Sequence, residues 1–129
     1  MLTISQVAKE TSLSVKSIRY YEQIGLTSAP PRSENDYRYY PSALIKQLHF
    51  IKKTKDAGFS LKESKELLAL SENSGRRSAD VKALLSQKIE ELQTKINREQ
   101  ELLERLKNIT QKCCGDEKPN CPIIDEFAN

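Results

Sequence analysis

Cys113, Cys114 and Cys121 lie within nine residues near the end of the 129-residue chain. Thiolates are preferred ligands of soft metal ions, and paired thiols can also be oxidised to a disulfide. Residues 1–10 lack the basic and then apolar pattern of a signal peptide, and no apolar run is long enough to cross a bilayer. We therefore expect a cytoplasmic protein, in which clustered cysteines indicate metal binding or redox chemistry before a structural disulfide.

The small number of sulfur atoms favours a soft monovalent metal ion. Two thiolates in a line can satisfy Cu(I), whereas Zn²⁺ takes about four ligands in a tetrahedron. Cys113 and Cys114 are adjacent and rarely reach one ion together, and the single histidine, His49, is far away in the sequence. Zinc stays open because nearby carboxylates could complete its ligand set, and a disulfide between Cys113 and Cys121 stays open too. The carboxylates are those of Asp116, Glu117, Asp125 and Glu126.

A short helix is expected to follow the last cysteine. Cys121 precedes Pro122, a residue that suits the first turn of a helix, and this helix would end at Phe127. Two thiolates on one monovalent ion leave one net negative charge, which a buried site has to offset. The free N–H groups and partial positive charge at the start of the helix would stabilise such an anionic complex.

A long amphipathic helix is predicted from Ser78 to Thr110. Its apolar residues recur with a 4-3-4 spacing, which the polar Glu99 interrupts once. A helix of roughly nine turns cannot bury this seam on so small a remainder of the chain, so we expect a homodimeric coiled coil. A long helix packed on its own domain is the alternative. The seam consists of Leu85, Ile89, Leu92, Ile96, Leu103 and Leu106.

Two short helices joined by a polar turn are expected at the start of the chain. Thr3 and Gln6 have the spacing of a capping box, and a second helix should run from Val15 to about Ile24, with Gly25 just beyond it. This arrangement is that of a helix-turn-helix. Residues 1–60 carry nine Lys or Arg against five Asp or Glu, in a chain whose net charge is +3. The basic half favours a polyanion partner.

Lys16, Arg19 and Tyr20 are predicted to face solvent on the second helix, because Val15 and Ile18 turn inward. The major groove of DNA admits a helix, and Lys or Arg near the helix start can reach guanine O6 and N7. We therefore expect Lys16 and Arg19 to contact base edges, with Tyr20 beside them. A solvated helix face without a DNA contact is the alternative.

A small two-stranded wing is predicted between Pro30 and Pro41. All five tyrosines of the chain lie between positions 20 and 40, among three arginines, and such basic and phenolic side chains suit contacts to phosphate. The alternative is an aromatic mini-core under a loop. The residues expected to position phosphates are Tyr21, Arg32, Tyr37, Arg38 and, on a third helix, Lys55.

The predicted fold is therefore mainly α, and it is divided into three parts. A winged helix-turn-helix DNA-binding domain spans residues 1–71, including a third helix from Ser42 and a fourth that Ser60 opens with a capping box. The dimerisation helix spans residues 78–111. A metal-binding loop and a short helix occupy residues 112–129. No pairing of a nucleophile with a base and no phosphate loop is evident, so we do not expect an enzyme.

Several of these segments resemble the MerR family of transcription regulators, and the resemblance covers nearly the whole chain. The segments are Ile4 to Ala8, Ser17 to Glu22, Gly25-Leu26, Arg32 to Asn35, Tyr37 to Tyr40 and Ala57 to Leu61. The tail is similar to that of the copper-efflux (CueR-type) branch, in which two cysteines have seven residues between them and Pro-Ile-Ile follows. Cys113 and Cys121 have that spacing, and residues 122–124 are Pro-Ile-Ile.

The resemblance implies that Cys113 and Cys121 bind Cu(I), with Ag(I) or Au(I) as substitutes, near Ser78 of the partner subunit. Divalent-metal sensors of the family carry a cysteine where this chain has Ser78. Cys114 departs from the branch pattern and leaves open whether a third sulfur joins the site.

The resemblance also implies a homodimer whose long helices pair antiparallel and set two heads on palindromic promoter DNA. Metal binding would make the dimer distort an overlong promoter spacer so that RNA polymerase can use both promoter elements, activating genes for copper export or oxidation. A zinc- or cadmium-sensing regulator, a thiol-redox regulator and a metal-buffering coiled-coil protein remain as alternatives.

Overall fold

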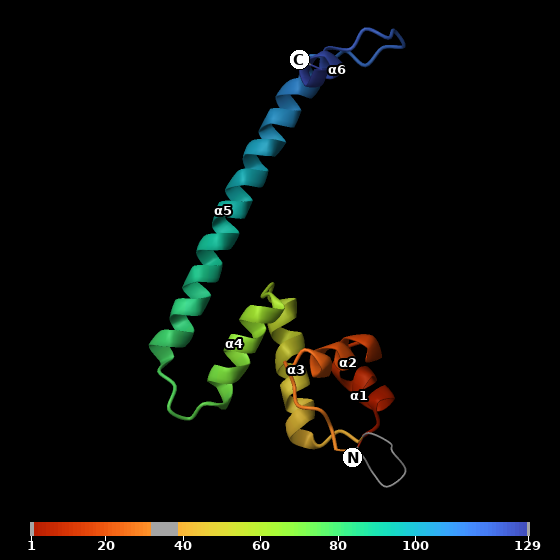
Figure 1. The fold of residues 1–129 in the computed structure, drawn as a ribbon. Coiled ribbons are helices and arrows are strands. Elements are labelled where there is room, and N and C mark those ends of the chain that lie inside the picture. The colour runs from red at the N-terminus through yellow and green to blue at the C-terminus, as the bar shows by residue number, and fades with distance from the viewer. Residues whose placement is uncertain (1, 32–38, 129) are drawn as a thin grey trace. The chain divides into compact units, whose positions relative to one another are not determined.

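The computed structural model describes residues 2–31 and 39–128, and within these ranges the chain is helical with no named strand. The mainly α prediction is therefore confirmed, and each predicted helix is present (Figure 1). The helices are α1 (Ile4–Thr11), α2 (Val15–Gln23), α3 (Ser42–Asp56), α4 (Leu61–Glu72), α5 (Ser78–Gln111) and α6 (Pro122–Ala128).

Helix starts are fixed by the local capping chemistry. At α1, the Gln6 N–H donates to Thr3 Oγ1 over 3.4 Å, while the Thr3 N–H donates to Gln6 Oε1 over 2.8 Å. The same reciprocal pair forms at α4, where Ser60 and Glu63 are joined by bonds of 2.8 and 3.1 Å. These two capping boxes satisfy N–H groups that a helix start otherwise leaves without a partner, so both boundaries follow from local sequence.

Residues Met1–Val81 form one compact unit. In this unit α1 contacts α2 and α3, and α3 in turn contacts α4 (Figure 1). Gly25 follows α2 with φ +76°, the left-handed conformation that glycine adopts most easily. The core is formed by buried residues from α1, α2, α3 and α4 together with their connections. Its members are Val7, Ile18, Tyr21, Leu26, Tyr40, Leu44, Leu48, Ile51 and Leu68.

The predicted wing falls largely on residues 32–38, which lie outside the described residues. At its edges, the Tyr39 N–H donates to the Pro31 carbonyl over 3.4 Å. An isolated antiparallel bridge also joins Leu2 to Tyr40. These contacts bring the two ends of the segment together, and the two-stranded wing stays a prediction.

Residues Lys82–Asn129 form the second compact unit, which contains most of α5 and all of α6. The six seam residues of α5 are between 41% and 64% exposed. Within this unit the seam is thus open to solvent, and its pairing with a second copy stays a prediction. Over the described ranges, no helix combines the length and apolar character that a membrane span requires.

Candidate nucleic-acid interface and metal centre

Helix α2 turns a basic face to solvent. Ser14 caps the helix, its Oγ accepting the Ser17 N–H over 3.0 Å, and Ile18 is fully buried. With Ile18 fixed inward, Lys16 and Arg19 are exposed. Tyr20 is 48% exposed on the same helix. Lys16, Arg19 and Tyr20 are thus oriented toward solvent as predicted, and their contacts with DNA stay a prediction.

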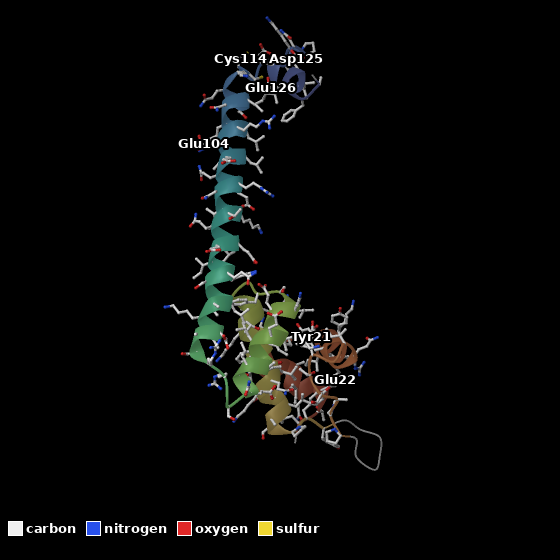
Figure 2. All side chains as sticks on the ribbon, turned by 60° about the vertical axis from the view of Figure 1, so that its left-hand side comes forward. Tyr21, Glu22, Glu104, Cys114, Asp125 and Glu126 are labelled. Carbon is white, nitrogen blue, oxygen red and sulfur yellow. The ribbon has the colours of Figure 1, made fainter. Side chains whose placement is uncertain are left out.

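Tyr21, the next residue along α2, is largely buried. Its side chain is only 6% exposed and belongs to the core of the first unit (Figure 2). The reason is helical geometry, because residues three apart share a face and Ile18 faces inward. Tyr21 therefore has a packing role, and a contact between its hydroxyl and phosphate stays a prediction.

The other residues expected to contact phosphate divide into two groups. Lys55 is exposed in the last turn of α3, as a phosphate contact requires. Arg32, Tyr37 and Arg38 lie outside the described residues. Their assignment as phosphate contacts stays a prediction.

The metal-binding candidates lie where α5 ends and α6 begins. All three thiols are free, with Cys113 and Cys121 half-buried and Cys114 exposed. The Cys113 N–H donates to the Thr110 carbonyl over 3.1 Å, which holds this cysteine at the last turn of the helix. Cys113 Sγ in turn accepts the Gly115 N–H over 3.4 Å. The disulfide left open by the sequence is not formed in the structure.

Cys121 lies at the start of α6, and its surroundings favour the thiolate. A hydrogen bond from the Ile124 backbone is the largest influence and lowers the pKa of the Cys121 thiol, while burial opposes it. The Ile123 backbone and the Cys113 side chain lower this pKa further, and the Asp125 carboxylate raises it. The Cys113 side chain and the N–H groups at the start of α6 thus both favour the Cys121 thiolate, and binding of a metal ion by the two sulfurs stays a prediction.

Cys114 lies apart from this pair in its contacts. Its thiol donates to Asp116 Oδ2 over 3.3 Å, and the residue is exposed (Figure 2). In the part of the chain that the structure describes, no group of three or more His, Cys, Asp or Glu residues is placed to hold a metal ion. The free thiols that are half-buried in this region are Cys113 and Cys121, and thiolates are ligands of soft metal ions.

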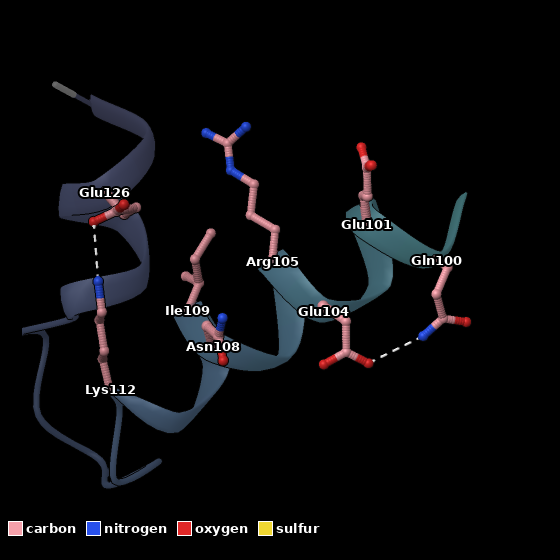
Figure 3. A pocket seen from close by; sticks show the side chains of 8 residues that line it. All are labelled: Gln100, Glu101, Glu104, Arg105, Asn108, Ile109, Lys112 and Glu126. Carbon is pink, nitrogen blue, oxygen red and sulfur yellow. Dashed lines mark hydrogen bonds and ion pairs between the residues drawn. The ribbon is translucent and has the colours of Figure 1, made fainter. Parts of the chain in front are cut away.

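Helix α6 is fastened to the end of α5 within the second unit. Lys112 Nζ and Glu126 Oε2 are 3.6 Å apart, and this ion pair joins the two helices across a hollow (Figure 3). Ile109, which also lines this hollow, is 4% exposed. The ion pair therefore links the residue that follows α5 to the helix that follows Cys121.

Two family models match the chain. One, described as MerR HTH family regulatory protein, matches residues 2–71, and another, described as MerR, DNA binding, matches residues 45–109. This chain belongs to the MerR family. It is accordingly a DNA-binding transcription regulator and not an enzyme, as the sequence predicted.

Similar proteins extend along the whole length of this MerR-family chain. Heavy metal-dependent transcription regulator 2 of Rhizobium meliloti (strain 1021) is 44% identical over 99% of this chain and 87% of its own length. The HTH-type transcriptional regulator CueR of Yersinia pestis is 42% identical over 98% of this chain and 91% of its own. The recognition of the family and of its CueR-type branch is thereby confirmed.

A solved structure gives the same fold. The transcription regulator PbrR691 of Ralstonia metallidurans CH34, crystallised in complex with lead(II), matches with a TM-score of 0.88. The sequence identity is 27%, and the match covers 98% of this chain and 99% of the other.

One hydrogen bond in the first unit of this MerR-family chain was not predicted from the sequence. The Tyr40 hydroxyl donates to Glu22 Oε1 over 2.5 Å and links the end of α2 to the residue before Pro41. Both residues lie in segments that resemble the MerR family, but their separation of 18 positions does not indicate that they interact. The available signal is the acidic residue in the last turn of α2, where the helix dipole disfavours negative charge.

Proposed function

We propose that this chain is a cytoplasmic, homodimeric transcription activator that senses Cu(I) through Cys113 and Cys121. The observation that carries the proposal is a pair of free, half-buried thiols, Cys113 after α5 and Cys121 before α6, with the Cys113 side chain and the N–H groups at the start of α6 lowering the pKa of Cys121. The site offers two soft ligands and a partial positive charge, which together suit one monovalent ion. Relatives named as heavy metal-dependent and as CueR support the assignment of a metal effector.

The exclusion of divalent ions is assigned in part to Ser78. This residue begins α5, at a position where divalent-metal sensors of the family carry a cysteine. In the proposed dimer, Ser78 of the partner subunit lies near the bound Cu(I) and supplies a hydroxyl and backbone donors in place of a third thiolate. Ag(I) and Au(I) share the thiolate preference of Cu(I) and would substitute for it.

The DNA contacts are assigned to the first unit, with residues 1–71 as the DNA-binding domain and residues 78–111 as the dimerisation helix. Lys16 and Arg19 on α2 contact base edges in the major groove, and Tyr20 lies beside them. Lys55 positions the phosphate backbone, as do Arg32, Tyr37 and Arg38 of the proposed wing. Two heads of a dimer then fit a palindromic operator, in keeping with the family model described as MerR, DNA binding.

The metal acts by biasing a two-state dimer. Metal binding by the two sulfurs would order the loop of residues 112–121 and favour one arrangement of the two DNA-binding domains in the dimer. In that arrangement the dimer would distort the promoter spacer so that RNA polymerase can use both promoter elements. Bending a DNA site of the size of an operator costs a free energy on the order of 1–6 kcal/mol. The metal therefore has to favour the distorting state by a comparable free energy.

A promoter-spacer transcription assay tests the proposal. Reduced protein is added to polymerase and an operator promoter with an overlong spacer, with and without Cu(I), and a promoter with a shortened spacer is the matched control. We expect Cu(I) to raise the transcript yield at least about tenfold on the overlong spacer, equivalent to roughly 1.4 kcal/mol. The shortened promoter should not require Cu(I).

The same assay separates the alternatives. Zn²⁺ or Cd²⁺ in place of Cu(I) should leave the yield at its metal-free level, and so should peroxide without metal. A response to Zn²⁺ would assign the chain to the zinc-sensing alternative, and a response to peroxide would make it a redox switch. Uptake of Cu(I) with no change in transcript yield would overturn the activation mechanism.

A further inference from the structure

The contact between Glu22 and Tyr40 links α2 to the segment that leads into α3. The Tyr40 hydroxyl donates to Glu22 Oε1 over 2.5 Å. Tyr40 is fully buried, whereas Glu22 is half-buried near the end of α2, next to Tyr21 in the chain (Figure 2). A charged acceptor makes this a stronger hydrogen bond than one between neutral groups.

The position of Glu22 is unfavourable for the helix alone. It lies in the last turn of α2, where the partial negative charge of the helix end repels a carboxylate, and that turn contains no basic residue. Glutamate at this point therefore has no role in stabilising α2 as an isolated helix. Its interaction with Tyr40 provides a reason for a carboxylate here.

Tyr40 is a fixed point in the first unit. Its backbone N–H donates to the Leu2 carbonyl over 2.9 Å, and its ring is part of the hydrophobic core. The next residue, Pro41, precedes α3, and its carbonyl accepts the Leu44 N–H over 3.0 Å. The backbone and ring of Tyr40 are thus held by the N-terminal segment and the core, directly before the start of α3.

We propose that Tyr40 and Glu22 form a positioning contact that sets the orientation of α2 for contact with DNA bases. Arg19 and Glu22 are three residues apart on one helix and are neighbours on its surface. Fixing Glu22 therefore fixes the rotation of the helix that carries Lys16 and Arg19. Bidentate contacts to a base require placement within roughly 0.5 Å and 10–20°, so a small rotation of α2 weakens them.

This inference rests on the proposed role of α2 in base contacts, and the experiment separates the two. Operator and non-specific DNA affinities are measured for Tyr40→Phe, which removes the hydroxyl and keeps the ring. We expect operator affinity to fall about tenfold, with less than about a twofold change in non-specific affinity, since phosphate contacts provide the latter. Glu22→Gln keeps an oxygen that can accept the bond, and it should retain operator affinity within about threefold.

Ser64→Ala is the matched control for loss of a buried hydroxyl. Ser64 Oγ accepts from Thr54 Oγ1 over 2.8 Å between α3 and α4, and Ser64 is fully buried. This variant should unfold at a lower temperature, as Tyr40→Phe does, while keeping its operator affinity. If both variants lose the same operator affinity, Tyr40 serves stability alone and the positioning role is overturned.

A double-mutant cycle with Glu22→Ala and Tyr40→Phe tests whether the two residues act as a unit. We expect the double variant to lose little more operator affinity than either single variant. Independent, additive losses would contradict the proposal. Arg19→Ala reports on α2 itself: if it changes operator preference while Tyr40→Phe does not, the positioning role fails and the proposed function stands. If Arg19→Ala has no effect on operator preference, the proposed role of α2 in base contacts is wrong, and the positioning role that rests on it is wrong as well.

Discussion

At the scale of single residues, the metal site depends on which sulfur atoms can approach one another. The Cys113 side chain helps to lower the pKa of the Cys121 thiol, whereas the Cys114 thiol donates to Asp116 over 3.3 Å. The adjacent residues Cys113 and Cys114 therefore differ in their contacts, although the sequence alone left the role of Cys114 in the metal site open.

Replacing the ligand sulfurs one at a time should separate metal sensing from DNA binding. Cys113→Ser and Cys121→Ser should each weaken Cu(I) binding at least about a hundredfold, since loss of an outer-shell partner already costs roughly 10- to 100-fold. Operator affinity without metal should stay unchanged, because the first unit is untouched. Competition titration with a Cu(I) chelator under reducing conditions measures the affinity. Cys114→Ser is the matched control, and a comparable loss in that variant would show that two ligands are too few.

Arg19 carries the prediction for base contacts. Arg19→Ala should cost about 1–3 kcal/mol against the preferred operator and relax the preference at one base pair. Binding to a panel of operators with single base changes measures both effects. Arg98→Ala removes an exposed arginine from α5 and serves as the control. An unchanged base preference in Arg19→Ala would remove Arg19 from the interface.

The burial of Tyr21 shows what residue type cannot reveal. Tyrosine suits both a phosphate contact and a core, and clustering with arginine favoured the first. The i, i+3 relation to Ile18 was the signal for the burial of its ring, since a shared helix face implies a shared environment. The bond from Tyr40 to Glu22 lay beyond sequence reasoning, because it depends on tertiary packing across 18 positions.

At the scale of elements, helix boundaries were largely predictable because caps are local. The capping boxes at Thr3 and Ser60 place the starts of α1 and α4, and Pro122 begins α6 as expected. The ion pair between Lys112 and Glu126 of α6 was not foreseen. It depends on the chain folding back at the end of α5, which no periodic pattern encodes.

The open seam of α5 gives a prediction for this element. Ile89 is 64% exposed in the single chain, so Ile89→Glu should leave the helix intact and disrupt its pairing with a second copy. Burial of an isoleucine contributes roughly 1.5–3 kcal/mol per copy, so the dimer dissociation constant should rise at least about a hundredfold. Sedimentation over a range of concentrations measures this.

Gln87→Glu is the control for the added charge. Gln87 is exposed on α5 and lies off the seam, so this variant should sediment as the wild type does. Equal effects of the two substitutions would mean that charge, and not the apolar seam, governs pairing. A fully dimeric Ile89→Glu variant would place the dimer contact elsewhere.

At the scale of the whole molecule, function requires two heads to engage one duplex. In the proposed dimer, the paired α5 helices fix the distance between the two α2 helices, and the operator half-sites have to match it. Half-sites on one face of DNA are separated by a whole number of turns, each about 10–10.5 base pairs. The excess of basic residues in positions 1–60 supplies attraction to any duplex, so sequence preference depends on this match.

Changing the half-site separation tests that geometry. Inserting about half a turn, roughly 5 base pairs, moves one half-site to the opposite face of the duplex, where a dimer of fixed span cannot reach it. Operator affinity should then fall toward the non-specific level, a loss of at least about a thousandfold for a typical regulator. A single half-site is the control and should bind as weakly as the lengthened operator. Unchanged affinity after the insertion would mean that each head binds independently, and metal binding could not then distort the spacer through the paired helices.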